Sequence, residues 1–279
     1  MLSKILQKEN RRTLITALYC IIFYGLMLYK IANGLLLMQV NPVFFCSRED
    51  IFTWAFMQSG LHQCLLNSPS KCVLMDALFY SSPAIYILHY FGHRSTAFFS
   101  GIWMLLINWL YVQCYTLYPT NSIEGHTAWL LFPILFMVRK ESTFNLLFEG
   151  LRYFFLYFFA SAGLWKVRHG SVFLPSQMSG ILLGQHIQLL TNSPDYWQSK
   201  FILWLINNAW VSYSLYVSAT AIELFFMVGF FTKKLDKLLI LLFVVFLITD
   251  HLIMRIPYYE VMPFLITLYP GTSNEKNRL

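Results

Sequence analysis

Charged residues are scarce in this chain, which has 279 residues of which only 12% are Asp, Glu, Lys or Arg. Soluble domains carry about 25%. Hydrophobic residues make up 57% of the chain and aromatic residues 18%. So few polar side chains cannot cover a folded domain of this size in water. The composition excludes an ordinary water-soluble protein and predicts a polytopic membrane protein.

The chain also lacks the local motifs of common enzyme classes. It has no G-x-S-x-G, no H-E-x-x-H, no phosphate-binding glycine loop and no Rossmann fingerprint. Its five cysteines show no C-x-x-C and no metal-ligand spacing, so no metal site is predicted. Cys46, Cys64 and Cys72 share one segment outside the membrane, and the sequence is compatible with either a disulfide or free thiols there.

A nucleic-acid-binding surface is not expected either, despite the formal net charge of +7. The basic residues stand in short clusters between apolar runs, which is the pattern that orients membrane helices. They form no single basic patch of the kind that binds phosphate backbones. The lipid bilayer is the predicted partner, and nucleic acid is not.

Apolar runs of about 20 residues are long enough to cross a bilayer. They predict an all-α fold, a polytopic transmembrane helical bundle with about eight membrane segments, in a single domain over residues 1–279. The first run follows a basic N-terminal stretch and is expected to stay as a signal anchor. The predicted segments are residues 13–37, 72–91, 96–117, 127–138, 144–164, 201–231, 238–256 and 258–269.

Basic residues predict the orientation of these segments. Placing both termini in the cytoplasm puts twelve of the 20 lysines and arginines in inner segments and five in outer ones. We therefore expect a multi-pass membrane protein with both termini in the cytoplasm. Of the two outer segments, residues 39–71 include an amphipathic stretch at 51–66 that suits a helix lying on the membrane. Residues 166–200 are expected to form a loop with one short interfacial helix.

Ionisable residues inside the predicted segments are either structural pairs or functional groups. Glu149 and Arg152 are three residues apart and can pair on one helix face. Lys30 and Asp76 both fall near the outer face, which predicts an ion pair. Glu223 lies deep in its segment without a local partner. It could meet Arg152, meet the cytoplasmic lysines, or serve a function.

Lys166 follows a run of aromatic and small residues, residues 152–165. A lysine at the edge of hydrocarbon either extends its ammonium to the interface or acts as a base. In an apolar pocket the charged form is destabilised, which favours proton release.

Several ionisable groups from three segments are expected at one level of the membrane, toward the outer side. Their shared depth predicts one cavity, and histidine, lysine and carboxylate together suit proton transfer. The predicted catalytic residues are Lys166, His126 and His251, and the supporting residues are Asp250, Arg255, Glu124 and Glu223.

The order of these residues resembles the HTTM superfamily, which includes the vitamin K-dependent γ-glutamyl carboxylases. The family's aromatic helix ends in Ala-Gly-x-x-Lys, and here it reads Ala162-Gly163-Leu164-Trp165-Lys166. A family histidine opens the preceding helix, where this chain has Gly125-His126 with glycine in place of asparagine. A late Phe-His corresponds to Asp250-His251, and a Pro-aromatic run follows it.

The resemblance implies a role for each of these positions. Lys166 would be the base that deprotonates a reduced quinone similar to vitamin K, and His126 would assist at the carbanion or carboxyl group. The 279 residues hold no counterpart of the carboxylase's large extracytoplasmic domain. The resemblance is therefore closer to bacterial members that mature secreted peptides, which implies a secreted peptide or protein substrate and a membrane or extracytoplasmic partner subunit.

Three function classes remain open from the sequence. The first is an intramembrane enzyme, or its catalytic membrane subunit, which modifies or matures an exported peptide by carboxylase-like or other chemistry. The second is a proton-coupled transporter in which Lys166, Glu223 and the histidines relay protons. No inverted repeat or matching pair of glycine-broken segments favours it. The third is a membrane partner or immunity protein without chemistry of its own.

Overall fold

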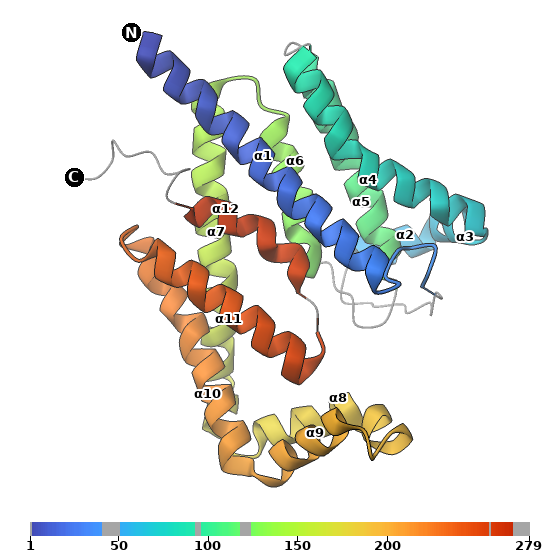
Figure 1. Ribbon diagram of the computed structural model, residues 1–279, viewed down its shortest axis with the longest axis vertical. Helices are drawn as coiled ribbons and strands as arrows, with labels where there is room; N and C mark the ends of the chain where they lie inside the picture. Colours follow the sequence, from blue (N-terminus) through green and yellow to red (C-terminus); the bar gives the residue numbers. More distant parts are fainter. Residues whose placement is uncertain (1, 41–50, 93–95, 118–123, 257, 270–279) are drawn as a thin grey trace. The chain divides into compact units, whose positions relative to one another are not determined.

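The computed structural model describes residues 2–40, 51–92, 96–117, 124–256 and 258–269 (Figure 1). Within these ranges all regular secondary structure is helical, which confirms the all-α prediction. The chain divides into two compact units. Unit 1 comprises Met1–Leu151, Tyr258–Thr267 and Gly271–Leu279, and unit 2 comprises Arg152–Pro257 and Leu268–Pro270. That residues 1–279 form a single domain stays a prediction.

Five described helices are long and apolar enough to cross a membrane, so a multi-pass membrane protein is supported while the count of about eight segments is not confirmed. Two of the remaining predicted segments appear as shorter apolar helices, Thr127–Phe136 and Tyr259–Leu268. Helix α7 (Glu141–Arg168) is long enough but is not among the five. The five are Arg11–Ala32, Pro69–Gly92, Ala97–Tyr115, Ala209–Phe230 and Asp236–Met254.

Unit 1 is held together by an aromatic core. The rings of Phe79 and Tyr111 stack with centroids 3.9 Å apart, and Trp129 packs against Phe79. Such rings bury large apolar areas and dominate the energetics of a core. The core lies among helices whose bounds are α1 (Leu2–Ala32), α4 (Pro69–Gly92), α5 (Ala97–Tyr115), η1 (Glu124–His126), α6 (Thr127–Phe136), η4 (Tyr259–Phe264) and α12 (Leu265–Leu268).

The amphipathic stretch at residues 51–66 is not one helix. It forms α2 (Ile51–Gln58) and α3 (Leu61–Leu66), which are separated at Gly60. Gly60 has φ 70°, a left-handed conformation that glycine adopts without the penalty of a Cβ atom. The turn redirects the chain, so the expected continuous helix on the membrane is replaced by two short ones.

Unit 2 has its own core, in which Phe155, Phe159, Phe226 and Phe243 pack edge to face. A Cβ atom at Gly229 would lie 2.5 Å from Leu156 Cδ2, so only glycine permits this close approach. The unit comprises the second half of α7 together with η2 (Ser171–Phe173), α8 (Gln177–Asn192), α9 (Trp197–Asn207), α10 (Ala209–Phe225), η3 (Phe226–Phe230) and α11 (Asp236–Met254).

The predicted segment 201–231 is wrong as a single helix, because it breaks at Asn208. There the backbone leaves helical geometry, with φ −103° and ψ 71°. Both the backbone N–H and the side-chain Nδ2 of Asn208 donate to the carbonyl of Trp204, at 3.0 and 2.7 Å. An asparagine side chain that bonds the local backbone competes with helix propagation. The break separates α9 from the membrane-crossing α10.

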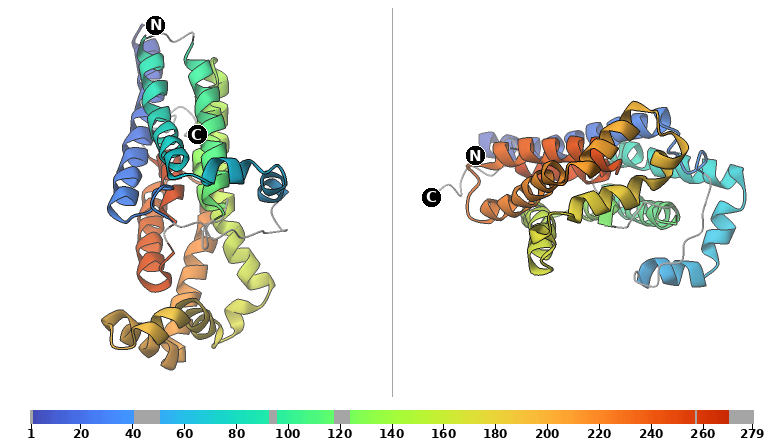
Figure 2. Two further views of the ribbon diagram at one scale, coloured as in Figure 1. Left: turned by 90° about the vertical axis from the view of Figure 1, so that its right-hand side faces the viewer. Right: turned by 90° about the horizontal axis from the view of Figure 1, so that it is seen from below.

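The outer segment 166–200, expected to be a loop with one short interfacial helix, is mostly helical. Its 16-residue helix α8 runs beside α9, and the two form a hairpin (Figure 2). The hairpin shares a small apolar core with the ends of α10 and α11, which contains Met178, Leu182, Ile202, Tyr216 and Ile253. The hairpin is therefore a packed part of unit 2.

The crossing by α10 predicts a measurable topology. Because α10 and η3 together form one membrane-length apolar helix, Asn207 and Lys234 should face opposite sides. The excess of inner basic residues places Lys234 inside. We expect a membrane-impermeant maleimide to label Asn207→Cys but not Lys234→Cys in intact cells, and to label both after permeabilisation. Equal labelling of both positions in intact cells would contradict this crossing.

Candidate functional site

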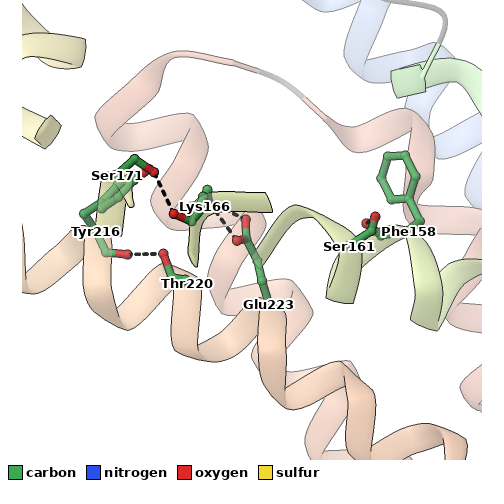
Figure 3. Close-up of polar contacts among 7 residues, drawn as sticks. All are labelled: Phe158, Ser161, Lys166, Ser171, Tyr216, Thr220 and Glu223. Carbon is green, nitrogen blue, oxygen red and sulfur yellow. Dashed lines mark hydrogen bonds and ion pairs between the residues drawn. The ribbon is translucent and has the colours of Figure 1, made fainter. Parts of the chain in front are cut away.

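Lys166 and Glu223 form an ion pair in unit 2. Lys166 Nζ donates to both carboxylate oxygens of Glu223, at 2.7 and 2.8 Å (Figure 3). Glu223 is buried, whereas 24% of the Lys166 side chain is exposed. An ammonium has three N–H donors, and the third has no acceptor among the described residues. The two charges thus neutralise each other, while the lysine side chain remains partly exposed.

The position of Glu223 shows where the ammonium lies. Glu223 is well inside Ala209–Phe230, a helix long and apolar enough to cross a membrane, and the Lys166 ammonium is bonded to it there and not at a helix end. A lysine that serves as an interfacial anchor extends its ammonium toward water. The expectation that Glu223 meets Arg152 or the cytoplasmic lysines was wrong, because Lys166 is its partner.

A glycine allows the two helices to approach closely here. A Cβ atom at Gly163 would lie 2.9 Å from Leu224 Cγ and 3.1 Å from Glu223 Cβ. Gly163 precedes Lys166 by almost one turn of α7 and therefore lies on a neighbouring part of the same helix face. Small residues at such contacts let membrane helices pack backbone to backbone.

A hydroxyl network supports the lysine from the other side. Ser171 Oγ donates to the Lys166 carbonyl at 3.1 Å and lies 3.0 Å from Tyr216 Oη. Thr220 Oγ1 donates to the Tyr216 carbonyl at 2.9 Å. The ammonium lies 5.4 Å from the centre of the Tyr216 ring, within cation–π range. Figure 3 shows Glu223 at the Lys166 side chain, Ser171 at the Lys166 carbonyl, and Thr220 joined to Tyr216 of its own helix.

A second carboxylate belongs to this cluster. Asp250 on α11 interacts electrostatically with both Lys166 and Glu223. Its Oδ2 atom is buried and has no hydrogen-bond partner among the described residues. One ammonium and two carboxylates would carry a net negative charge in apolar surroundings, and one added proton neutralises it. The three groups can therefore bind and pass on a proton.

The end of α11 carries two further predicted residues. His251 follows Asp250 and is half-buried. Arg255 ends the helix with φ 56°, and its N–H bonds the carbonyl of His251. This left-handed conformation is rare for a residue other than glycine and often marks a constrained functional region.

The α8–α9 hairpin holds the same helix end through its side chains. His186 Nε2 contacts the carbonyl of Ile253 at 2.7 Å, and Gln185 Nε2 donates to the carbonyl of Met254 at 2.7 Å. Gln198 Nε2 donates to the carbonyl of Leu252 at 3.4 Å. These side chains satisfy carbonyls that have no partner within α11.

Sequence reasoning missed several residues of this site. Tyr216 and Thr220 precede the predicted Glu223 at helical spacing, and that pattern could have indicated one polar face on α10. His186 and Ser171 lie in the segment that was predicted as a loop with one short interfacial helix. Their partners are backbone carbonyls, which leave no signal in the sequence.

His126 lies in unit 1, in a different buried cluster. Lys30 Nζ is 2.7 Å from Glu260 Oε1, and His126 Nε2 is 3.8 Å from the same oxygen. The Lys30 ammonium also lies 4.1 Å from the centre of the Tyr115 ring. All three ionisable side chains are buried. Glu260 is a partner that sequence reasoning did not identify.

The predicted pair of Lys30 and Asp76 was wrong. Asp76 instead accepts hydrogen bonds from the backbone N–H groups of Leu37 and Met38, at 3.1 and 3.0 Å, and from Tyr111 Oη at 2.8 Å. Three donors can stabilise a buried carboxylate without a cation. Lys30 therefore forms its ion pair with Glu260 and not with Asp76.

The predicted pair of Glu149 and Arg152 was wrong as well. Arg152 Nη2 donates to Asp236 Oδ1 at 2.7 Å, and both side chains are buried in unit 2. Glu149 instead lies 3.7 Å from Arg11 Nη2 in unit 1. Neither residue uses its neighbour on the same helix.

The structure thus brings together Lys166, Glu223 and Asp250. His251 and Arg255 lie in the same unit, on and just after α11. His126 and the backbone of Glu124 belong to unit 1, so a cavity that His126 shares with Lys166 and His251 stays a prediction.

The cluster of Lys166, Glu223 and Asp250 contains no cysteine. Cys64 and Cys72 are free thiols, and Cys46 lies outside the described residues. In the part of the chain that the structure describes, no group of three or more His, Cys, Asp or Glu side chains is placed to hold a metal ion.

No protein-family model, no characterised protein and no solved structure matches this chain. Proposals about its function therefore rest on its own residues and on the HTTM resemblance.

The close approach at Gly163 predicts a specific sensitivity. Gly163→Ala should push α10 away from α7 and destabilise unit 2 by about 1–3 kcal/mol, the usual cost of overpacking. Gly150→Ala is the matched control, because it lies on the same helix and a Cβ atom there meets nothing within 4 Å. Thermal unfolding in lipid nanodiscs would measure both. Equal melting temperatures for the two variants would contradict the close contact.

His186 predicts a pH dependence of hairpin docking. Burial lowers the pKa of His186 below its usual 6.5, as does the charge of Arg255, while the bond to the Ile253 carbonyl opposes this. The folded hairpin therefore favours neutral histidine, so its stability is full above about pH 6.5 and falls as acid protonates the ring. Hydrogen exchange in α8 should be faster at pH 5 than at pH 7.5.

His186→Gln supplies the control for that experiment, because glutamine keeps a donor for the carbonyl but does not titrate. Exchange in α8 of this variant should be nearly independent of pH. The same acceleration at pH 5 in both proteins would exclude His186 as the cause.

Proposed function

We propose that this chain is an intramembrane enzyme, or the catalytic membrane subunit of one, which modifies or matures an exported peptide with Lys166 as the base. The observation that carries the proposal is the Lys166–Glu223 pair with Asp250 beside it. Before Lys166 can act as a base, its ammonium must give a proton to another group, and Glu223 is bonded to it directly.

The pair can act by moving one proton. In the resting arrangement Lys166 is an ammonium and Glu223 a carboxylate, which keep each other charged. Transfer of the proton along the hydrogen bond from Lys166 Nζ to Glu223 gives a neutral amine and a neutral acid, a form that low polarity favours. The amine then takes a proton from the substrate. Asp250 can then accept the proton held by Glu223, which restores the charged pair, and the cluster regains its first state when Asp250 releases that proton to water.

The HTTM resemblance supports the same assignment, since it gives Lys166 the role of base. We propose His251 and His126 as further catalytic residues, with Arg255 and Glu124 in support. Peptide maturation on the extracytoplasmic side, with a carboxylase-like reaction as one form, follows from the same resemblance. So does a separate partner subunit that binds the peptide.

A reduced quinone is the cofactor that the resemblance implies, and the lysine side of the cluster fits such a group. Lys166 is partly exposed, and its third N–H has no acceptor among the described residues, so it could hold a quinol oxygen. Bound there, a reduced quinone would supply the redox chemistry that amino-acid side chains cannot supply.

We propose eight membrane segments with both termini in the cytoplasm of a bacterial cell. The five long apolar helices and the two shorter ones support this arrangement. Helix α7 would be the remaining segment. Its two charges inside the predicted span, Glu149 and Arg152, are both paired within the protein, which lowers the cost of crossing.

Proton-coupled transport is the second candidate, and Asp250 favours it. A buried carboxylate oxygen without a hydrogen-bond partner among the described residues is a natural proton-binding atom. A transporter would use the same three groups but would move its substrate unchanged. A partner or immunity protein, in contrast, would need the charges only for structure.

Lys166→Arg separates a base from a structural cation. Arginine keeps the charge and can still pair with Glu223, but it does not release its proton at usable pH. We expect the variant to be expressed normally and to lose nearly all maturation of a co-expressed exported peptide, measured as the peptide's mass change. Glu223→Gln should lose activity as well, since glutamine cannot accept the proton.

Lys200→Arg is the matched control, because Lys200 forms an exposed pair with Asp195 that should contribute little. Wild-type processing by Lys166→Arg would refute the base. A peptide that crosses the membrane unmodified in a Lys166-dependent way would instead support transport. Processing that withstands both Lys166→Arg and Glu223→Gln would leave only the structural role.

A further inference from the structure

The outward face of α9 is aromatic and exposed. Trp197, Phe201 and Trp204 follow one another at helical spacing and are 62%, 40% and 50% exposed. Residues four and three positions apart lie on one side of a helix. They form a continuous stripe, which we call the aromatic stripe.

The opposite face of α9 is buried against the protein and carries both apolar and polar residues, Ile202, Leu205, Gln198 and Ser199. Gln198 and Ser199 bond the carbonyls of Leu252 and Ser193. A helix that packs on a soluble protein turns polar residues outward, whereas the outward face of α9 carries the aromatic stripe. Water is therefore the wrong solvent for the aromatic stripe.

The stripe continues directly into a membrane helix. Asn208 ends α9, and the crossing helix begins at Ala209. Trp210, in the first turn of α10, is 72% exposed. An apolar side chain exposed on a membrane-crossing helix meets lipid. The exposed indole of Trp210 thus begins the exposed apolar surface of α10 directly after α9 in the chain.

The length and chemistry of α9 place it at the surface of the bilayer. Its 11 residues span about 16 Å, about half of the hydrocarbon thickness, so α9 cannot cross. Tryptophan concentrates at the headgroup level, where its ring is apolar and its N–H finds a polar partner. Lys200, on the same side of the helix, has a largely exposed side chain that can reach lipid phosphate.

We propose that the α8–α9 hairpin docks on the bilayer, with the aromatic stripe in the phospholipid headgroup region of the leaflet that α10 enters. The partner is the lipid surface. The inference rests on the exposed face and its continuity with α10, and it does not depend on the proposed enzymatic function.

Spin labels on the full chain in phosphatidylcholine nanodiscs test this depth. Phe201→Cys and Trp204→Cys carry the label, in a background in which the chain's own cysteines are replaced by serine or alanine. Collision with oxygen reports lipid, and collision with a water-soluble nickel chelate reports water. Asp195→Cys, whose side chain is 98% exposed, supplies the aqueous reference. Val245→Cys, exposed at the midpoint of α11, supplies the deep reference, and the buried Ile202→Cys supplies a label enclosed by protein.

The proposal expects both stripe labels to show an oxygen-to-nickel collision ratio several-fold above that of Asp195→Cys and below that of Val245→Cys. A ratio equal to the aqueous reference would overturn it, because the stripe would face water. A ratio equal to the deep reference would overturn it in favour of a crossing helix. Exclusion of both reagents, as at Ile202→Cys, would show that a second copy or another protein covers the stripe.

Discussion

An ionised side chain inside a membrane must be neutralised by the protein itself, and this constraint governs the packing of both units. Hydrocarbon offers no water to solvate a charge, so an unpaired ion costs several kilocalories per mole. Lys166 meets Glu223, Arg152 meets Asp236, and Lys30 meets Glu260. Each pair joins two helices, and removing one partner of a buried pair typically costs about 3–5 kcal/mol. The pairs therefore help to specify which helices pack together.

That constraint also explains why helices could be predicted and partners could not. Runs of apolar residues identify membrane helices locally, and all five long apolar helices were expected from the sequence. Pairing, in contrast, joins residues far apart in the chain, 57 positions for Lys166 and Glu223 and 84 for Arg152 and Asp236. The local rule of three-residue spacing selected Glu149 for Arg152, and tertiary packing overrode it.

The remaining errors in the fold have local causes of a different kind. Hydropathy alone does not register the break at Asn208, because apolar residues continue on both sides of it. The break depends on an asparagine that bonds the backbone of its own preceding turn. In residues 166–200 one short helix was expected, but not the length of α8 or its packing, because its polar side chains face the end of α11. Of the site, the sequence identified Lys166, Glu223 and Asp250 as ionisable residues in need of an explanation, but not that they form one cluster.

Pairing by itself does not distinguish a structural charge from a functional one, and here exposure makes the difference. Arg152 and Asp236 are 3% and 7% exposed at their side chains, and Lys30 and Glu260 are 4% and 8% exposed, so these pairs are closed. Lys166 is 24% exposed, and the second carboxylate beside it, Asp250, has an oxygen without a hydrogen-bond partner among the described residues. A purely structural pair gains nothing from an extra buried carboxylate, which adds a desolvation cost. A group that binds a proton and passes it to a substrate needs both access and a second acceptor. The Lys166 cluster combines the two, and this is why we assign the chemistry to it.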